Sequence, residues 1–314
     1  MKDNIRNRVS IVIPCYNEEG NIKKLYCQIK PHVAEYTVEY LFVDDNSSDK
    51  TLGVIEDLAS KDDNVRYLSF SRNFGHQSAL RAGLEFSTGD CVISMDADLQ
   101  HPPELLPAMI NKWKEGYDIV YTIRRDIENV SLFKKITASV FYKLINFLSD
   151  VEIKEGAADF RLLDKKIVEI LINNISEYHL FYRGLISWIG YKQTGIEYIP
   201  NKRYSGKTKY SFLKMVNLAL NGITSFSIKP LKIAILLGLI FSLLSGVYGL
   251  YVLWVSVFTD KTVEGWTSVI LSILFIGGIN MILLGIIGEY VGKIYIQIKK
   301  RPHFLVSKTN IKNG

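Results

Sequence analysis

The sequence predicts an α/β domain with a Rossmann-like, mostly parallel sheet, followed by a hairpin of two transmembrane helices. Short apolar runs alternate with helical stretches over residues 9–122, and this alternation is typical of parallel sheets with helices on both faces. The apolar runs are nearly continuous, as in strands that are buried on both faces. Further along, residues 233–258 and 266–288 contain no charged side chain, and about 20 apolar residues span a bilayer as a helix.

The expected strands and helices follow one another in pairs along the N-terminal part of the chain. The pairs are VSIVIP with NEEGNIKKLYCQIKPHV, EYLFVDD with SDKTLGVIEDLAS, VRYLSF with HQSALRAGLEFS, and DCVISMDAD with PELLPAMINKW, before a last strand YDIVYT. We expect acidic residues in the first turn of the first helix, where the helix dipole favours negative charge. Ser47, Ser48 or Asp49 is the expected cap of the second helix, because these side chains accept hydrogen bonds from free backbone N–H groups.

The basic residues around the two apolar segments predict the orientation in the membrane. Lysines precede the first segment and follow the second, whereas the linker TDKTVEG holds only Lys261. The flanking basic residues are Lys229, Lys232, Lys293, Lys299, Lys300 and Arg301. The positive-inside bias then places both outer ends, and with them the N-terminal domain and both termini, in the cytoplasm. In a bacterium this corresponds to a multi-pass protein of the inner (cytoplasmic) membrane.

Four parts are expected along the chain. They are a catalytic domain over residues 1–210, an interfacial amphipathic helix over 211–232, the hairpin over 233–290 and a cytoplasmic tail over 291–314. Two alternatives stay open: the apolar segments could be buried core helices, and the amphipathic helix could pack under the catalytic domain instead of lying in the membrane interface.

The net charge indicates the class of partner, and the cysteines indicate the redox compartment. The formal net charge of +6 fits anionic partners, and the basic residues beside the apolar segments favour anionic lipid and lipid phosphate over nucleic acid. The three cysteines, Cys15, Cys27 and Cys91, are odd in number, and their spacing suits neither a disulfide framework nor a zinc site. We interpret them as reduced thiols of a cytosolic domain.

Polar residues end four consecutive expected strands. They are Pro14 to Glu19 after the first strand, Asp44 and Asp45 after the second, Ser71 to Asn73 after the third, and Asp96 to Asp98 after the fourth. A single such end could be a helix cap. Because ligands of open α/β sheets bind at the carboxyl ends of the strands, four together predict a ligand site at this edge.

The stretch SMDADLQHPPE predicts how that site holds a diphosphate. The chain has neither the G-x-G-x-x-G nor the G-x-x-x-x-G-K-[ST] fingerprint, so a glycine-rich phosphate loop is not expected. The carboxylates of Asp96 and Asp98 repel each other unless a cation lies between them and the substrate. Hard oxygen ligands of this kind, with Gln100 as a neutral addition, suit Mg²⁺ or Mn²⁺.

The ordered set of motifs IPCYNEE, VDDNSSDKT, RNFGHQSALRAG and DADLQHPPE resembles the inverting family-2 glycosyltransferases, which have a GT-A fold. Within that family the chain is similar to the membrane-anchored branch that glycosylates polyprenyl phosphates, which includes bactoprenol glucosyltransferases and dolichol-phosphate mannose synthases. The stretches GAADFRLLDKK, YRGLISWIGY, RYSGKTKYS and the hairpin ending in GEYVGKIY resemble the same branch. The resemblance covers about residues 9–300.

The resemblance implies roles for individual residues. It places the nucleotide sugar on Pro14, Tyr16, Asn17, Glu19, Asp44, Asp45, Asn73 and Asp96, and the metal with the sugar diphosphate on Asp96, Asp98 and Gln100. Asp98 and Asp159 are the expected catalytic residues, and Asp159 is the family's candidate general base. Arg124, Arg125, Lys134, Arg203 and Lys209 are expected to bind the diphosphate or the acceptor phosphate. For the arginine pair and Lys134 the alternative is a solvated basic face near anionic lipid.

Elementary chemistry questions the role of Asp159. A phosphate monoester is largely ionised near pH 7, since its second pKa is about 6, so a phosphate acceptor barely needs a general base. Asp159 could instead orient the acceptor or the sugar, and a structural partnership with Arg161 is a further alternative. His76, His101 and Asn73 could approach the ligand or simply form helix entries.

The predicted function is transfer of one sugar, most simply glucose from UDP-glucose, to undecaprenyl or another polyprenyl phosphate on the cytoplasmic leaflet, with inversion. Mannose transfer from GDP-mannose and a non-catalytic membrane-bound nucleotide-sugar sensor are the alternatives. A processive synthase is disfavoured because the chain lacks Q-x-x-R-W. A homo-oligomer, a tetramer by resemblance, stays open, and a two-helix hairpin implies a separate flippase for the product.

Overall fold

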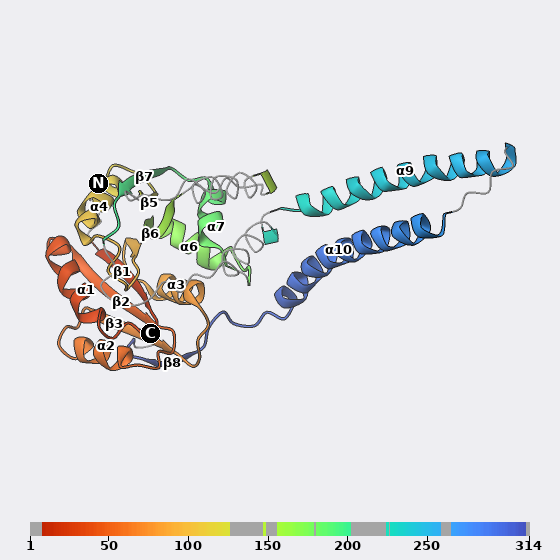
Figure 1. Ribbon diagram of the computed structural model, residues 1–314. Coiled ribbons are helices and arrows are strands. Elements are labelled where there is room, and N and C mark those ends of the chain that lie inside the picture. The colour runs from red at the N-terminus through yellow and green to blue at the C-terminus, as the bar shows by residue number, and fades with distance from the viewer. Residues whose placement is uncertain are drawn as a thin grey trace.

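The computed structural model describes residues 8–125, 147–148, 156–178, 180–201, 224–225, 227–258 and 265–311. A domain with a central sheet lies at one end, and two long helices extend away from it side by side (Figure 1). This arrangement confirms the predicted fold class of a mostly parallel α/β sheet followed by two apolar helices.

One sheet of eight strands organises the domain, in the order β7-β5-β6-β4-β1-β2-β3-β8. The strands are β1 (Arg8–Cys15), β2 (Thr37–Asp44), β3 (Val65–Phe70), β4 (Cys91–Ser94), β5 (Ile119–Arg124), β6 (Ala157–Asp164), β7 (Gln193–Tyr198) and β8 (Val306–Thr309). The predicted parallel strands β1 to β4 pair in parallel, whereas β6 and β8 run antiparallel to their neighbours. The carboxyl ends of β1, β2 and β4 therefore lie along one edge of the sheet.

Helices cover both faces of this sheet. The helices of the domain are α1 (Ile22–Ile29), η1 (Lys30–Val33), α2 (Thr51–Ala59), α3 (His76–Phe86), η2 (Pro103–Leu105), α4 (Leu106–Lys114), α6 (Lys165–Asn173) and α7 (Tyr182–Ile189). Because side chains alternate along a strand, Ile11 and Ile13 of β1 pack with α1, α2 and α4, whereas Val12 packs with α3, α6 and α7. Gly83 lets α3 approach β1 closely, since a Cβ there would lie 2.0 Å from Val12 Cγ1.

Two helix starts differ from the prediction. The first helix has no acidic residue in its first turn, because it begins at Ile22, after the acidic loop. The second begins at Thr51, whose N–H and hydroxyl both donate to Asp49 Oδ1, at 2.9 and 2.5 Å. The residue at the cap position is Lys50, which is none of the three expected caps. Of those three, Asp49 binds the first residue of the helix, while Ser47 and Ser48 bind the loop after β1.

The two C-terminal helices are long and apolar enough to cross a membrane. They are α9 (Lys229–Phe258) and α10 (Trp266–Ile298), and the candidate spans Lys229–Tyr251 and Phe275–Ile298 have mean hydropathies of 2.3 and 1.6 with no part of either window buried. Helix α9 starts before residue 233 and helix α10 continues past residue 290, so both helices are longer than the uncharged segments. The interfacial helix expected over 211–232 lies largely outside the described residues.

The chain beyond α10 returns to the sheet. β8 pairs antiparallel with β3, Phe304 stacks on Phe70 with ring centroids 5.2 Å apart, and the Ser71 N–H donates to Leu305 O at 2.9 Å. At the end of α10, Gln297 Oε1 accepts from the Tyr178 N–H at 2.7 Å. The sequence predicts only a cytoplasmic tail here, but these contacts attach the hairpin to the domain.

A buried carboxylate stabilises the opposite edge of the sheet. Glu39 accepts from Ser10 Oγ at 2.6 Å and from the Thr88 N–H at 3.0 Å, and it forms an ion pair with Arg66. Burial alone would raise the pKa of Glu39, but these hydrogen bonds and the arginine lower it below its usual value. The ionised form is thus the one that the fold stabilises.

We expect Glu39→Gln to lower the midpoint of thermal unfolding at pH 7, because the ion pair is lost. A carboxylate with a lowered folded-state pKa stabilises the fold above its unfolded pKa of about 4.3, and this contribution is lost as the pH falls. The difference from the unsubstituted protein should therefore shrink between pH 5 and pH 3, as measured by thermal unfolding in detergent. Glu115→Gln, which changes an exposed partner of Lys112, is the control. An equal difference at all pH values would contradict the role of the charge.

Candidate active site

The loops after β1 and β2 form one unit at the carboxyl edge of the sheet. Asn17, which has a positive φ of 56°, donates its N–H to Ser47 Oγ at 2.9 Å and accepts from the Ser48 N–H at 2.8 Å. Glu19 Oε2 accepts from the Lys50 N–H at 2.9 Å. These cross-links hold the predicted nucleotide-binding loop in place and leave Tyr16 41% exposed.

Two other predicted nucleotide-binding positions are buried. Pro14 lies inside β1, opposite Val43 of β2. Asp44 is 1% exposed and accepts from the Ser47 N–H at 3.2 Å and from Ser69 Oγ at 2.9 Å. Asp44 thus shapes the turn after β2, and the binding roles of both residues stay predictions.

Asp45 fixes the turn that leads into α3. Its two carboxylate oxygens accept from the backbone N–H groups of Phe74 and Gly75, at 2.6 and 2.9 Å. Burial raises the pKa of Asp45, against the effect of these two hydrogen bonds. Asn73 precedes this turn and is exposed. Asp45 therefore positions the loop that carries Asn73 and His76, and its contact with a nucleotide stays a prediction.

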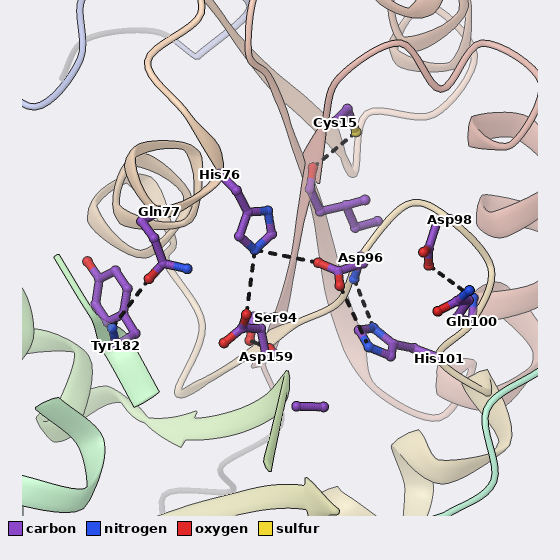
Figure 2. A network of polar contacts seen from close by, with 12 residues as sticks. Cys15, His76, Gln77, Ser94, Asp96, Asp98, Gln100, His101, Asp159 and Tyr182 are labelled. Carbon is purple, nitrogen blue, oxygen red and sulfur yellow. Dashed lines mark hydrogen bonds and ion pairs between the residues drawn. The ribbon is translucent and has the colours of Figure 1, made fainter. Parts of the chain in front are cut away.

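The two aspartates of the D-x-D motif lie in a tight turn after β4 (Figure 2). Leu99 takes a left-handed backbone conformation with φ 64°, and the Gln100 N–H donates to Asp98 Oδ1 at 3.1 Å. Arg124, at the end of β5, donates to Gln100 Oε1 at 3.3 Å. The fold thus brings Asp96, Asp98, Gln100 and one predicted phosphate-binding arginine to one place.

His101 is buried beside this turn and holds its backbone in place. Its Nδ1 accepts from the Asp96 N–H at 3.1 Å, so Nε2 carries the proton of the neutral ring, and Nε2 lies 3.7 Å from Asp96 Oδ2. The imidazole is 6% exposed and stacks on Phe160 with centroids 4.9 Å apart. His101 thus positions Asp96, a role that differs from the ligand contact and the helix entry expected from the sequence.

Asp159 on β6 lies on the other side of the site, in a network of charged groups. Arg183 Nε and a terminal nitrogen donate to its two oxygens at 3.2 and 3.0 Å, and Arg161 donates at 3.0 Å. His76 Nε2 lies between the two acidic groups, 4.0 Å from Asp159 Oδ2 and 3.6 Å from Asp96 Oδ1 (Figure 2). Burial alone would raise the pKa of Asp159, but the two arginines lower it far below its usual value.

The remaining predicted phosphate-binding residues are less well placed or not described. Arg125 pairs with Glu197 at 2.5 Å, both exposed. Lys134, Arg203 and Lys209 lie outside the described residues. The candidate site residues expected from the sequence do not include Arg183. Only the resemblance of YRGLISWIGY hinted at it, because the residue lies far along the chain from Asp159 and on a different element.

Two family models match the chain: Glycosyl transferase family 2 over residues 10–171 and the GtrB C-terminal hairpin over residues 229–294. The chain belongs to glycosyltransferase family 2. A prophage bactoprenol glucosyl transferase homolog of Escherichia coli (strain K12) is 41% identical over 303 residues, 96% of this chain and 99% of that protein. The SfII prophage-derived bactoprenol glucosyl transferase of Shigella flexneri is 40% identical over 305 residues, 96% and 98% of the two chains.

Further similar proteins include a bacterial glycosyltransferase and a solved structure. The uncharacterized glycosyltransferase YkcC of Bacillus subtilis (strain 168) is 43% identical over 302 residues, 96% of this chain and 93% of that protein. Among solved structures, the mannosyltransferase PcManGT of Pyrobaculum calidifontis, in complex with GDP-Man and Mn²⁺, has a TM-score of 0.45 and 18% identity over 65% of this chain and 59% of that chain. The membership in family 2 rests on the family models and the curated relatives.

The donor atoms of this glycosyltransferase fit a divalent cation that is shared with substrate. In the part of the chain that the structure describes, no three His, Cys, Asp or Glu side chains gather around one point. Asp96, Asp98 and Gln100 still offer hard oxygen ligands on one turn. Mg²⁺ is commonly bound by one or two carboxylates together with substrate phosphates, so the donor set suits a metal that completes its shell with a diphosphate.

Proposed function

We propose that the chain transfers one sugar from a nucleotide donor, UDP-glucose, to undecaprenyl or another polyprenyl phosphate. The observation that carries this proposal is the similarity to bactoprenol glucosyl transferases over 96% of the chain, the acidic edge and the hairpin included. The product is a polyprenyl-monophosphate sugar for later modification of a glycan. A phosphate oxygen of the acceptor forms the bond to the anomeric carbon from the face opposite the leaving group, which inverts that centre.

Asp96, Asp98 and Gln100 are the proposed ligands of Mg²⁺ or Mn²⁺. When bound, the cation neutralises negative charge on the leaving diphosphate. As the bond from the anomeric carbon to the diphosphate breaks, its electron pair goes to the diphosphate oxygen, and Arg124 lies beside Gln100 to stabilise the charge that develops there. The loop with Tyr16, Asn17 and Glu19 is proposed to hold the nucleoside.

Asp159 is proposed to orient its neighbours, and no base is needed. A phosphate monoester is already ionised near neutral pH, so the attacking oxygen has no proton to lose. The two arginines that lower the pKa of Asp159 also make its carboxylate a weak proton acceptor, because an effective general base has a pKa near the working pH. This favours the orienting role over the family's general base.

The attachment of β8 supports a hairpin whose two ends lie on the same side of the membrane, because β8 and β1 belong to one sheet. The basic residues at both ends of the hairpin favour the cytoplasm as that side. A hairpin of this kind keeps the site at the leaflet that holds the acceptor headgroup, which raises its effective concentration. A tetrameric assembly and a separate flippase for the product remain part of the proposal by resemblance and by the small size of the hairpin.

The test is transfer by the purified full chain in detergent. Undecaprenyl phosphate, Mg²⁺ or Mn²⁺, and radiolabelled UDP-glucose, other UDP-sugars or GDP-mannose are incubated together, and label in the lipid phase is counted with and without EDTA. We expect label from UDP-glucose only, and none with EDTA. Label from GDP-mannose would replace the donor assignment. Binding of nucleotide sugar without transfer to any polyprenyl phosphate would favour the sensor.

A further inference from the structure

The strongest unassigned feature near the site is the contact between Arg183 of α7 and Asp159. Two guanidinium nitrogens meet two carboxylate oxygens at 3.2 and 3.0 Å, and such two-point contacts fix the plane of the guanidinium group. The side chains of Asp159 and Arg161 are only 12% and 3% exposed, whereas that of Arg183 is 33% exposed. Of the two arginines on Asp159, Arg183 is therefore the one that reaches the open side of the site.

Arg183 also lies close to the D-x-D turn. The first turns of α3 and α7 are in contact, as the hydrogen bond from the Tyr182 N–H to Gln77 Oε1 at 3.3 Å shows (Figure 2). His76, also in the first turn of α3, lies between Asp159 and Asp96.

The charges in this region are unevenly divided. At the D-x-D turn, Asp96 and Asp98 need a cation to accept a diphosphate. At Asp159, by contrast, two guanidinium groups face one carboxylate, and the more exposed of the two, Arg183, brings positive charge next to the metal motif. A phosphate monoester carries about −1.5 to −2 charges near pH 7, and the planar fork of arginine matches phosphate oxygens better than lysine does.

We propose that Arg183 binds the phosphate group of the lipid acceptor, and that Asp159 is the positioning residue that holds the Arg183 guanidinium in place. This inference rests on the proposed function in taking the acceptor to be a lipid phosphate monoester. In this arrangement the two arginines bind different groups: Arg124 binds the leaving diphosphate, and Arg183 binds the attacking phosphate of the acceptor. The carboxylate of Asp159 then acts through Arg183, without touching the acceptor.

The test separates binding of the acceptor from binding of the donor. Steady-state transfer is measured for the full chain and for Arg183→Gln and Arg183→Lys, with a short-chain polyprenyl phosphate and the nucleotide sugar varied in turn. We expect Arg183→Gln to raise the KM for the acceptor about tenfold or more, the loss of one hydrogen-bonded charge pair. We expect the KM for the donor to change less than about twofold. Arg183→Lys should recover only part of the loss, since it keeps the charge without the fork.

Arg8→Gln is the matched control, because Arg8 is an exposed arginine at the start of β1, the opposite edge of the sheet. Thermal unfolding of each variant shows whether it is folded, and Arg183→Lys serves if Arg183→Gln is not. An unchanged acceptor KM in a folded variant, or a rise in the donor KM alone, would overturn the inference while the proposed function stands. Absence of transfer by the unsubstituted chain, with every nucleotide sugar tried, would overturn both.

Discussion

Asp98→Asn is expected to lower kcat for sugar transfer by about 100- to 1000-fold, the usual cost of removing one group that stabilises charge in a transition state. The carboxylate lies on the turn after β4, where the Gln100 N–H donates to Asp98 Oδ1 at 3.1 Å. Asparagine keeps the shape and an acceptor for this bond but removes the negative charge that a divalent cation needs. The measurement is label transferred to the lipid phase at saturating donor, over a range of Mg²⁺ and Mn²⁺ concentrations.

Asp57→Asn is the control for this substitution, because Asp57 is exposed on α2 and pairs with Lys61 one turn away. It removes the same charge and should leave transfer unchanged. High metal concentration should restore part of the activity of Asp98→Asn if the substitution weakens metal binding. Full activity of Asp98→Asn at low metal concentration would remove the D-x-D turn from the catalytic mechanism.

Asp164→Ala is expected to lower the free energy of unfolding by about 2–4 kcal/mol. Asp164 is 5% exposed and uses both oxygens: Oδ1 accepts from the Lys166 N–H at 3.0 Å at the start of α6, and Oδ2 accepts from Trp113 Nε1 at 2.8 Å. Loss of a helix cap costs about 1 kcal/mol, and a buried N–H group left without an acceptor costs about 1–3 kcal/mol. The measurement is unfolding by heat or denaturant in detergent.

Two further variants show whether these bonds account for the loss. Asp164→Asn keeps an oxygen for the cap and should lose less stability than Asp164→Ala. In a Trp113→Phe background, Asp164→Ala should lower the free energy of unfolding by less than it does in the unsubstituted protein, because the indole N–H is already absent. Equal costs in the two backgrounds would mean that the bond between Trp113 and Asp164 contributes nothing.

The order of the elements from β1 to β5 and the site loops between them could be predicted from local sequence patterns. Continuous apolar runs such as IVIP and YLFVD identified β1 and β2, and the polar residues after them identified the carboxyl edge, because parallel strands bring those ends together. The uncharged segments identified α9 and α10. These features depend on residues that are close in sequence, so the pattern alone indicates them.

The partners of Asp159 and the path of the C-terminus depended on contacts between distant residues. β8 is short and fully exposed in its burial pattern, VSKT, so it has no apolar signal, and only the free edge of β3 makes it a strand. Arg183 reaches Asp159 because α7 packs on the face of the sheet that holds Leu163 of β6, and Asp159 lies on the same side of that strand.

The sequence by itself thus determined the α/β class, the two apolar helices of the hairpin and the position of the acidic motif. The tertiary structure alone decided that Arg183 and His76 join Arg161 around Asp159, and how the hairpin is attached to the domain. The physical reason is that hydrophobic periodicity is a local property, whereas the pairing of buried charges and sheet edges is set by the packing of the whole domain.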